Sequence, residues 1–232
     1  MVEEKVIQDE ANIKENEEIY ETIGGNALTL LKNRMGILIH CNSENIDKAK
    51  HDTALAPIYL GVERGYNFKI YSDEATPLLQ GDSLTSLELK KLGADITLIS
   101  SNMTSMVMKE GKIQTVLVEC DRIAANGDIA NEIGISGTAI LAKHYGIPFY
   151  VCAPLSTIDL NCAIGDDIHI ELRRDKGITI NGYENTMTQE GIKTYNPCFD
   201  VTEHDYITAI VTEKGIIYPP YDKNLPKILK YI

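Results

Sequence analysis

Residues 36–71 read GILIHCNSENIDKAKHDTALAPIYLGVERGYNFKIY, and this stretch predicts the fold class. It begins with the apolar run 36–40, continues into a helical pattern over 48–64 that ends at Gly65, and closes with a second apolar run over 68–71. Short apolar runs are typical of strands buried on both faces, and a helix between two such strands makes the βαβ unit of a parallel sheet.

The same alternation continues along the chain. Further strands are expected at 96–99, 115–118 and 149–151, and helices at 84–92, around the methionine-rich stretch 103–108 and at 137–145. Repeated alternation of strand and helix predicts an α/β fold, a Rossmann-like parallel sheet with helices on both faces.

The N-terminal part has a helical pattern of its own. An apolar stripe at helical spacing runs through residues 3–31, and Gly24-Gly25 interrupts it, which indicates a break or a close packing contact. We therefore expect an N-terminal helical segment at 1–31 followed by a Rossmann-like domain at 32–232.

The C-terminal part is less regular. We expect β-hairpins or an excursion over the sheet at 166–196 and a final helix at 206–213. Tyr218-Pro219-Pro220-Tyr221 cannot continue a helix and is expected to form a turn or an extended arm.

Composition narrows the class of function. The chain of 232 residues is 44% hydrophobic and 24% charged, as in ordinary globular proteins, with a formal net charge of −12 that would repel nucleic acid. Its apolar runs reach about six residues, against the ~20 that a membrane span needs, and the acidic N-terminus does not resemble a signal peptide. We expect a cytoplasmic protein without nucleic-acid or membrane partners.

The five cysteines do not predict a metal site. Cys41, Cys120, Cys152, Cys162 and Cys198 form no CxxC pair, and the histidines are equally dispersed. Reduced thiols inside a cell are the expectation.

Polar side chains follow the predicted strands. His40-Cys41-Asn42 follows the first, Ser72-Asp73-Glu74 the second, and Glu119-Cys120-Asp121-Arg122 the strand at 115–118. Ligands of open parallel sheets bind at the carboxyl ends of the strands, so these segments meet where a site is expected.

Each of these residues has a structural alternative. Cys41 beside His40 is a candidate reactive thiol, although an isolated cysteine is more often a small buried hydrophobe. Asp121-Arg122 is either part of a site or an ion pair, and Asn126-Gly127-Asp128 resembles a tight turn.

Several longer blocks resemble the methylthioribose-1-phosphate isomerase family. They are residues 39–42, residues 73–81 with Pro77-Leu78-Leu79-Gln80-Gly81, the segment DRIAANGDIAN at 121–131, and the blocks 148–159, 196–202 and 212–215. The resemblance runs from about residue 11 to the C-terminus. The superfamily also includes ribose-1,5-bisphosphate isomerases and the α, β and δ regulatory subunits of translation initiation factor 2B.

The resemblance implies an aldose–ketose isomerase that acts on a sugar 1-phosphate, without metal or organic cofactor. Cys41 and Asp121 match the family's acid–base pair. Four further residues match positions expected to bind the sugar hydroxyls or the phosphate: Asn42, Gln80, Asn126 and Asn131.

The chain also departs from the family pattern. It begins at the helix that links two domains in the family, so an Arg-Gly-Ala segment that helps to bind phosphate is expected to come from a separate chain if it is needed. The loop after Cys41-Asn42 reads Ser43-Glu44-Asn45-Ile46 where the family has small residues, and Glu132 replaces a lysine after Asn131. A non-catalytic regulatory or binding module, like the initiation factor subunits, is therefore the alternative hypothesis.

Self-association is a further expectation. The N-terminal helix and the Tyr-Pro-Pro-Tyr segment carry apolar groups with little chain of their own to cover them. A two-fold homodimer is the usual outcome for such surfaces.

Overall fold

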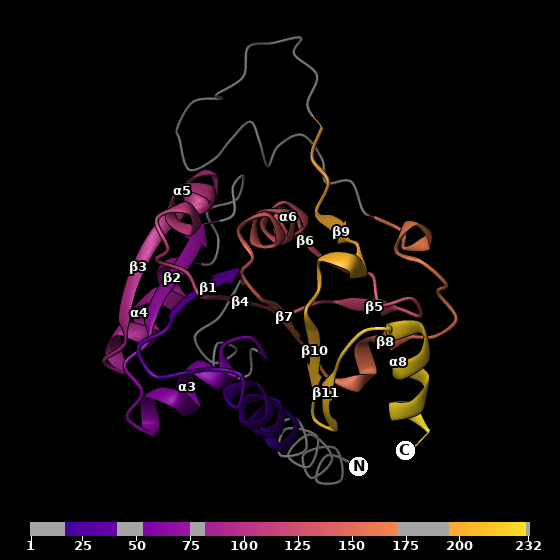
Figure 1. The fold of residues 1–232 in the computed structure, drawn as a ribbon, viewed down its shortest axis with the longest axis horizontal. Helices are drawn as coiled ribbons and strands as arrows, with labels where there is room; N and C mark the ends of the chain where they lie inside the picture. Colours follow the sequence, from indigo (N-terminus) through magenta and orange to yellow (C-terminus); the bar gives the residue numbers. More distant parts are fainter. Residues whose placement is uncertain (1–16, 41–52, 75–81, 171–194, 231–232) are drawn as a thin grey trace, which may run out of the picture.

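A seven-stranded sheet organises the chain. The computed structural model describes residues 17–40, 53–74, 82–170 and 195–230. Within them the strands of this sheet lie in the order β11-β10-β7-β4-β1-β2-β3 (Figure 1). They are β1 (Gly36–His40), β2 (Lys69–Glu74), β3 (Asp95–Ser100), β4 (Thr115–Val118), β7 (Phe149–Cys152), β10 (Ala209–Thr212) and β11 (Gly215–Ile217).

Six of these strands run parallel, and β11 pairs antiparallel with β10. The predicted α/β class is thus confirmed, and all five strands expected from the apolar runs are present. The parallel strands follow the order of doubly wound sheets, because the chain builds β1, β2 and β3 toward one edge and then places β4 on the other side of β1.

Helices cover both faces of the sheet. A helix over residues 17–28 and α3 (Ala56–Glu63) lie on one face, and α6 (Ile135–Tyr145) lies on the other (Figure 1). The remaining described helices are α4 (Asp82–Lys91), α5 (Thr104–Lys109), α8 (Tyr221–Leu229) and the short 3-10 turns η1 (Ser101–Met103), η2 (Leu155–Thr157), η3 (Gly165–Asp167) and η4 (His204–Tyr206).

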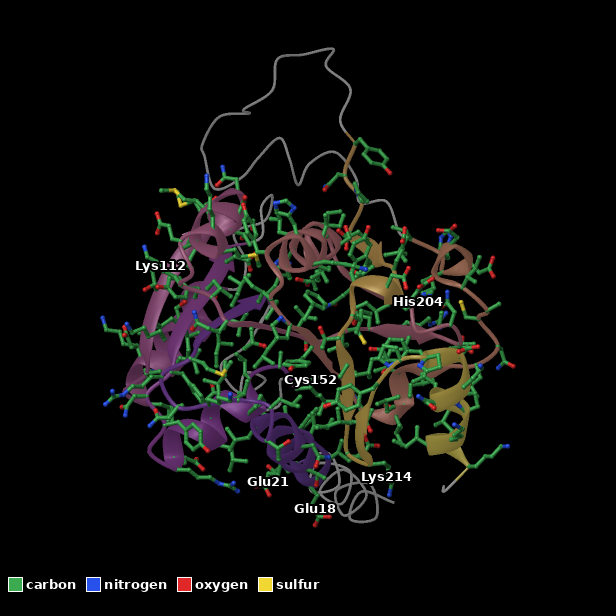
Figure 2. The ribbon with its side chains drawn as sticks, viewed as in Figure 1. Glu18, Glu21, Lys112, Cys152, His204 and Lys214 are labelled. Atoms are coloured by element: carbon green, nitrogen blue, oxygen red, sulfur yellow. The ribbon has the colours of Figure 1, made fainter. Side chains whose placement is uncertain are left out.

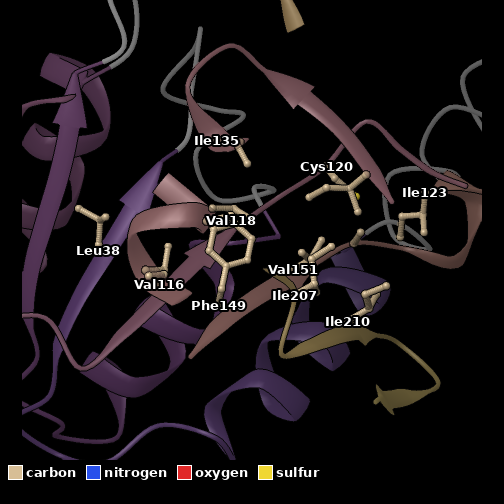
Figure 3. Close-up of a cluster of buried hydrophobic side chains, with 14 of the residues drawn as sticks. Leu38, Val116, Val118, Cys120, Ile123, Ile135, Phe149, Val151, Ile207 and Ile210 are labelled. Atoms are coloured by element: carbon tan, nitrogen blue, oxygen red, sulfur yellow. The ribbon is translucent and has the colours of Figure 1, made fainter. Parts of the chain in front are cut away.

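Strand residues alternate between two apolar cores. Leu38 of β1 joins the cluster under α6, whereas Ile37 and Ile39 join the cluster under α3 and the N-terminal helix. Figure 3 shows the first cluster, where Phe149 and Val151 of β7 lie near Val116 and Val118 of β4 and Ile135 of α6. This period of two is the geometry of a strand that is buried on both sides.

A second, smaller sheet lies beside the first. Its order is β8-β5-β6-β9, with β8 (Ile158–Asp159), β5 (Arg122–Ala124), β6 (Ile129–Glu132) and β9 (Phe199–Thr202). The Asn-Gly turn predicted at 126–127 joins β5 to β6, and Gly127 has a φ of 93°. The flanking strands were not predicted, because each is only two to four residues long.

The prediction for residues 206–213 was wrong. They contain η4 and the buried strand β10, and the final helix is α8, which begins directly after the predicted Tyr-Pro-Pro turn. Tyr221 is buried and its hydroxyl donates a hydrogen bond to the carbonyl of Ile207, whereas Tyr218, Pro219 and Pro220 are exposed. The apolar surface expected from this segment is thus present at residues 218–220 and absent at Tyr221.

The two helices on this face refine the predictions. The helix over 17–28 runs through Gly24-Gly25 without a break, and the alternative of a close packing contact is confirmed, since a Cβ on Gly24 would lie 3.0 Å from Ala56. The helix expected at 48–64 begins at Ala56, with Pro57 in its first turn. No described helix is both long and apolar enough to cross a membrane.

Candidate functional site

The strand order directs attention to the ends of β1 and β4. In doubly wound sheets, ligands bind at the carboxyl ends of the strands where the order reverses, which here lies between these two neighbours. His40 is the last residue of β1 and pairs with Val118, the last residue of β4. The segments that follow these two residues contain Cys41 and Asp121.

Asp121 lies between β4 and β5. Its backbone N–H donates a hydrogen bond to the carbonyl of Ala130 at 3.1 Å, which fixes it at the base of the β5–β6 hairpin. The residue as a whole is exposed, yet desolvation of the carboxyl by the surrounding chain raises its pKa above the ordinary value for aspartate. A carboxyl with a raised pKa at a strand end is suited to exchange a proton with a ligand.

Asn131 lies across the hairpin from Asp121. The pairing of Arg122 with Ala130 brings residues 121 and 131 to the same end of the two strands. Asn131 is buried, and its amide nitrogen donates a hydrogen bond to the carbonyl of Glu119 at 2.7 Å. Of the predicted substrate-binding residues that the structure describes, Asn131 is the one placed beside Asp121.

Asn126 lies at the opposite end of the hairpin. Its amide nitrogen donates to Asp128 at 2.7 Å, and its side-chain oxygen accepts from the backbone N–H of Asp128 at 3.0 Å. Both polar ends of the side chain are therefore occupied by the turn. The structure separates Asn126 from Asp121 along the hairpin and gives it a structural contact there.

A buried aspartate–histidine pair joins the ends of β1 and β2. Nδ1 of His40 lies 2.9 Å from both carboxylate oxygens of Asp73, and the two side chains are 2% and 0% exposed. Both residues were noted as strand-end polar groups, but their pairing was not predicted. Adjacent parallel strands with polar residues at matching register near their ends are the signal that could have shown it.

The first turn of α6 closes this region. Asp200 of β9 accepts hydrogen bonds from the backbone N–H of Gly134 and from the hydroxyl of Ser136, both at 2.8 Å. A carboxylate at this point satisfies orphan N–H groups and complements the helix dipole. Asp200 stood in one of the family-like blocks, but the sequence did not indicate its contact with a helix 64 to 66 residues away.

Three of the predicted site residues lie outside the described residues: Cys41, Asn42 and Gln80. Among the described cysteines, Cys120 is adjacent to Asp121 in sequence but points into the apolar core (Figure 3). Burial, followed by the charges of Asp121 and Glu119, raises the pKa of its thiol well above the usual value. Cys120 is therefore a protonated core residue and not a candidate acid–base group.

A groove of about 620 Å³ lies elsewhere in the molecule, between the helix over 17–28 and α3. Tyr20, Tyr59 and Glu63 are among its lining residues, and the strand ends are not. Within the described part of the chain, no cluster of three or more histidine, cysteine or acidic side chains could hold a metal ion.

Comparison with known proteins gives the family. The model of the initiation factor 2 subunit family matches residues 2–219. The chain belongs to this family. It is 58% identical over 221 residues to methylthioribose-1-phosphate isomerase of Symbiobacterium thermophilum and 56% identical over 216 residues to 5-deoxyribose 1-phosphate isomerase of Petrotoga mobilis. These alignments cover 95% and 93% of the chain and 62% of each relative.

Solved structures of the family share the fold. The δ subunit of translation initiation factor eIF-2B from A. fulgidus matches with a TM-score of 0.89 at 35% identity, covering 97% of the chain and 65% of that protein. The 5-methylthioribose 1-phosphate isomerase of Pyrococcus horikoshii matches with a TM-score of 0.83 at 33% identity, covering 93% and 60%. The family therefore contains an enzyme and an initiation factor subunit on one scaffold.

Proposed function

We propose that this chain carries the isomerisation site of an aldose–ketose isomerase for sugar 1-phosphates. The observation that supports it most is the 58% identity, across nearly the whole chain, to a protein named methylthioribose-1-phosphate isomerase. The position of Asp121 at the reversal of strand order, with a raised pKa, fits an acid–base group in such a site.

Cys41 and Asp121 are the proposed acid–base pair. Phosphate on C1 prevents the ring from opening as a free sugar does, so the ring oxygen has to take up a proton as its bond to C1 breaks. A proton then leaves C2, a proton is added at C1, and the C2 hydroxyl loses its proton to become the ketone, so protons balance. We assign the proton transfer at the ring oxygen to Asp121 and the proton transfer at carbon to the Cys41 thiol.

The substrate is proposed to be a ribose 1-phosphate with an uncharged 5-substituent, such as methylthioribose 1-phosphate or 5-deoxyribose 1-phosphate. Asn131, Asn42 and Gln80 are its proposed contacts, and Asn126 contributes through the turn. Glu132, next to Asn131, carries a negative charge, which disfavours a substrate with a second phosphate such as ribose 1,5-bisphosphate.

A regulatory module is the second candidate. The TM-score of 0.89 to an initiation factor δ subunit favours it, as do Glu132 and the carboxylate of Asp200 on the first turn of α6. An isomerase converts the sugar phosphate and needs Cys41 and Asp121 to do so, whereas a regulatory module converts none. One experiment therefore separates the two functions.

We also propose a homodimer in the cytoplasm, with a separate chain as the source of any further phosphate contacts. Exposed apolar side chains gather along the edge formed by β3 and the segments beside it, with Leu98 50% and Met106 65% exposed. Light scattering is expected to give about twice the 25.7 kDa chain mass, and a monomer would contradict the dimer.

Phosphorus and proton NMR tests the isomerase directly. The protein is incubated separately with methylthioribose 1-phosphate, 5-deoxyribose 1-phosphate and ribose 1,5-bisphosphate. We expect one of the first two sugars to become a ketose 1-phosphate, and Cys41→Ser to abolish this while the control Cys162→Ser, in a buried thiol of another region, leaves it unchanged. If no sugar is converted and none shifts the resonances of the protein, the regulatory module is favoured.

A further inference from the structure

The His40–Asp73 pair is a buried polar contact that the proposed proton transfers do not use. Both side chains lie on the face of the sheet that α6 covers, because Leu38 and Tyr71, two residues before them on β1 and β2, contact the cluster on that face. The register of Ile39 with Ser72 places the two residues side by side, His40 as the last residue of β1 and Asp73 as the last but one of β2.

The carboxylate fixes the state of the imidazole. A carboxylate oxygen accepts hydrogen bonds, so Nδ1 of His40 donates and carries a proton. The two oxygens of Asp73 are equally distant from Nδ1, at 2.9 Å, so the ring is aligned with the carboxylate. A histidine whose tautomer and orientation are set by a carboxylate is a recurring arrangement in functional sites.

The other side of the ring is held by α6. A Cβ on Gly134 would lie 3.1 Å from Cε1 of His40 and 3.6 Å from Nε2, so the backbone before α6 approaches the ring closely. Gly134 has a φ of 113°, and its N–H is bonded to Asp200. His40 is thus enclosed between the Asp73 carboxylate on β2 and the first turn of α6.

A purely structural role would explain the His40–Asp73 pair poorly, because the pair adds little stability at this buried position. A buried polar pair contributes little more to stability than apolar side chains of similar volume, since both groups lose hydration. The adjacent strand positions are apolar and buried, as at Ile37, Leu38 and Ile39. The polar pair stands where β1 ends and the chain passes to the next residue, Cys41.

We propose that His40 and Asp73 are positioning residues of the isomerase site. Asp73 holds His40 in one tautomer and one orientation, and the fixed histidine holds the end of β1 from which Cys41 follows. This inference rests on the proposed function, and it adds two residues that act through Cys41 without touching the sugar.

Three variants test the pair. Asp73→Asn keeps the shape of the side chain but removes its charge. His40→Asn retains an amide N–H close to the position of Nδ1, so it can still donate to Asp73. The double variant His40→Leu with Asp73→Leu removes both polar groups together, which avoids an unpaired buried charge. Asp95→Asn, an exposed aspartate at the amino end of β3, is the matched control.

Steady-state kinetics separates positioning from folding. We expect Asp73→Asn to lower kcat about tenfold to a hundredfold, as for carboxylates that orient histidines at metal sites, with KM changed by less than about threefold. We expect His40→Asn to retain more kcat than the double variant, because it can still donate to Asp73. We also expect the double variant to fold. Asp95→Asn should match the wild type.

A second readout does not depend on turnover. Iodoacetamide alkylation of Cys41, followed by peptide mass spectrometry, reports the environment of this thiol, and we expect Asp73→Asn to change its rate about fivefold or more. If the wild type isomerises sugars and Asp73→Asn retains full kcat and the same alkylation rate, the positioning role is wrong while the proposed function stands. If the wild type isomerises none of the sugars, the proposed function fails, and an altered alkylation rate would show only that the pair orders Cys41.

Discussion

Two aspartate–histidine pairs lie in different surroundings in this molecule. His40–Asp73 is enclosed at the ends of β1 and β2, with exposed fractions of 2% and 0%. His204–Asp128 lies beside the small sheet, where the histidine side chain is 41% exposed (Figure 2). The same two residue types are therefore used once in the enclosed edge of a parallel sheet and once near the surface.

Their bonding differs as well as their exposure. Asp128 accepts hydrogen bonds from the Asn126 side chain, from the backbone of Gly165, and from both the backbone and the ring of His204. It joins the β5–β6 turn, η3 and η4, so it is a clamp between three segments. Asp73 serves one histidine next to a proposed catalytic residue. This difference in bonding accords with our proposal that the strand-end pair positions the site, while the clamp stabilises the fold.

Asp121→Asn should have the largest effect on kcat. The substitution changes the strand-end region and leaves the clamp around Asp128 intact. We expect kcat to fall about 10²- to 10⁴-fold, the usual contribution of a general acid or base, while the thermal unfolding midpoint stays close to that of the wild type. NMR assays with 5-deoxyribose 1-phosphate and thermal melts measure both quantities. Unchanged kcat in Asp121→Asn would remove this residue from the proposed mechanism.

Asp128→Asn should have the opposite profile. Loss of the charge weakens four hydrogen bonds, and we expect the free energy of unfolding to fall by about 2–3 kcal/mol, the range for hydrogen bonds to a charged group. Urea denaturation measures it, with the exposed Asp166→Asn as control. If kcat per folded molecule falls together with stability, Asp128 also contributes to activity, and the division of roles between the two pairs is wrong.

Gly134→Ala sharpens the comparison from the other side of His40. A Cβ at a φ of 113° is strained, and it would press on the histidine ring. We expect about 1–2 kcal/mol of lost stability, the cost of one strained backbone residue. kcat should fall in addition, because the ring has to move. Gly146→Ala, also at positive φ but with open space around it, is the control for backbone strain alone.

The smallest expected effect is a pH dependence of the clamp. Burial alone would raise the pKa of Asp128, but the hydrogen bonds from Asn126, Gly165 and His204 outweigh it and lower the pKa. The folded protein then binds this proton less tightly than the unfolded chain, whose aspartates titrate near about 3.9. The contribution is present above about pH 4 and is lost as the pH falls through the lowered folded-state pKa.

Denaturation of the wild type and Asp128→Asn between pH 3 and 7 measures this contribution. We expect the difference in unfolding free energy between them to shrink at the acid end of the range. A difference that stays constant down to pH 3 would mean that Asp128 is not held ionised by the clamp.

The fold was predictable wherever the chain repeats a strand–helix unit. The runs at 115–118 and 149–151 continue the alternation of strand and helix, and both were placed correctly. Residues 209–212 have the same character, but a four-residue apolar run can also belong to a helix. Pairing with β7 decides its structure, and that contact is not visible in a local pattern.

The positions of the described candidate residues were predictable from the strand order, but their contacts were not. Strand-end reasoning brought Asp121 and His40 to one edge of the sheet, because parallel strands share a direction. The partner of His40, the use of Asn126 within its own turn and the contact of Asp200 with α6 depend on segments far apart or on side-chain geometry. Such contacts follow from packing and carry no periodic signal.

The most direct test of this account measures kcat and the free energy of unfolding for Asp73→Asn and Asp128→Asn side by side. We predict that Asp73→Asn loses at least about tenfold in kcat per folded molecule, whereas Asp128→Asn keeps its kcat and loses stability. Equal kcat in the two variants, or a larger loss in Asp128→Asn, would contradict the assignment of one pair to the site and the other to the fold.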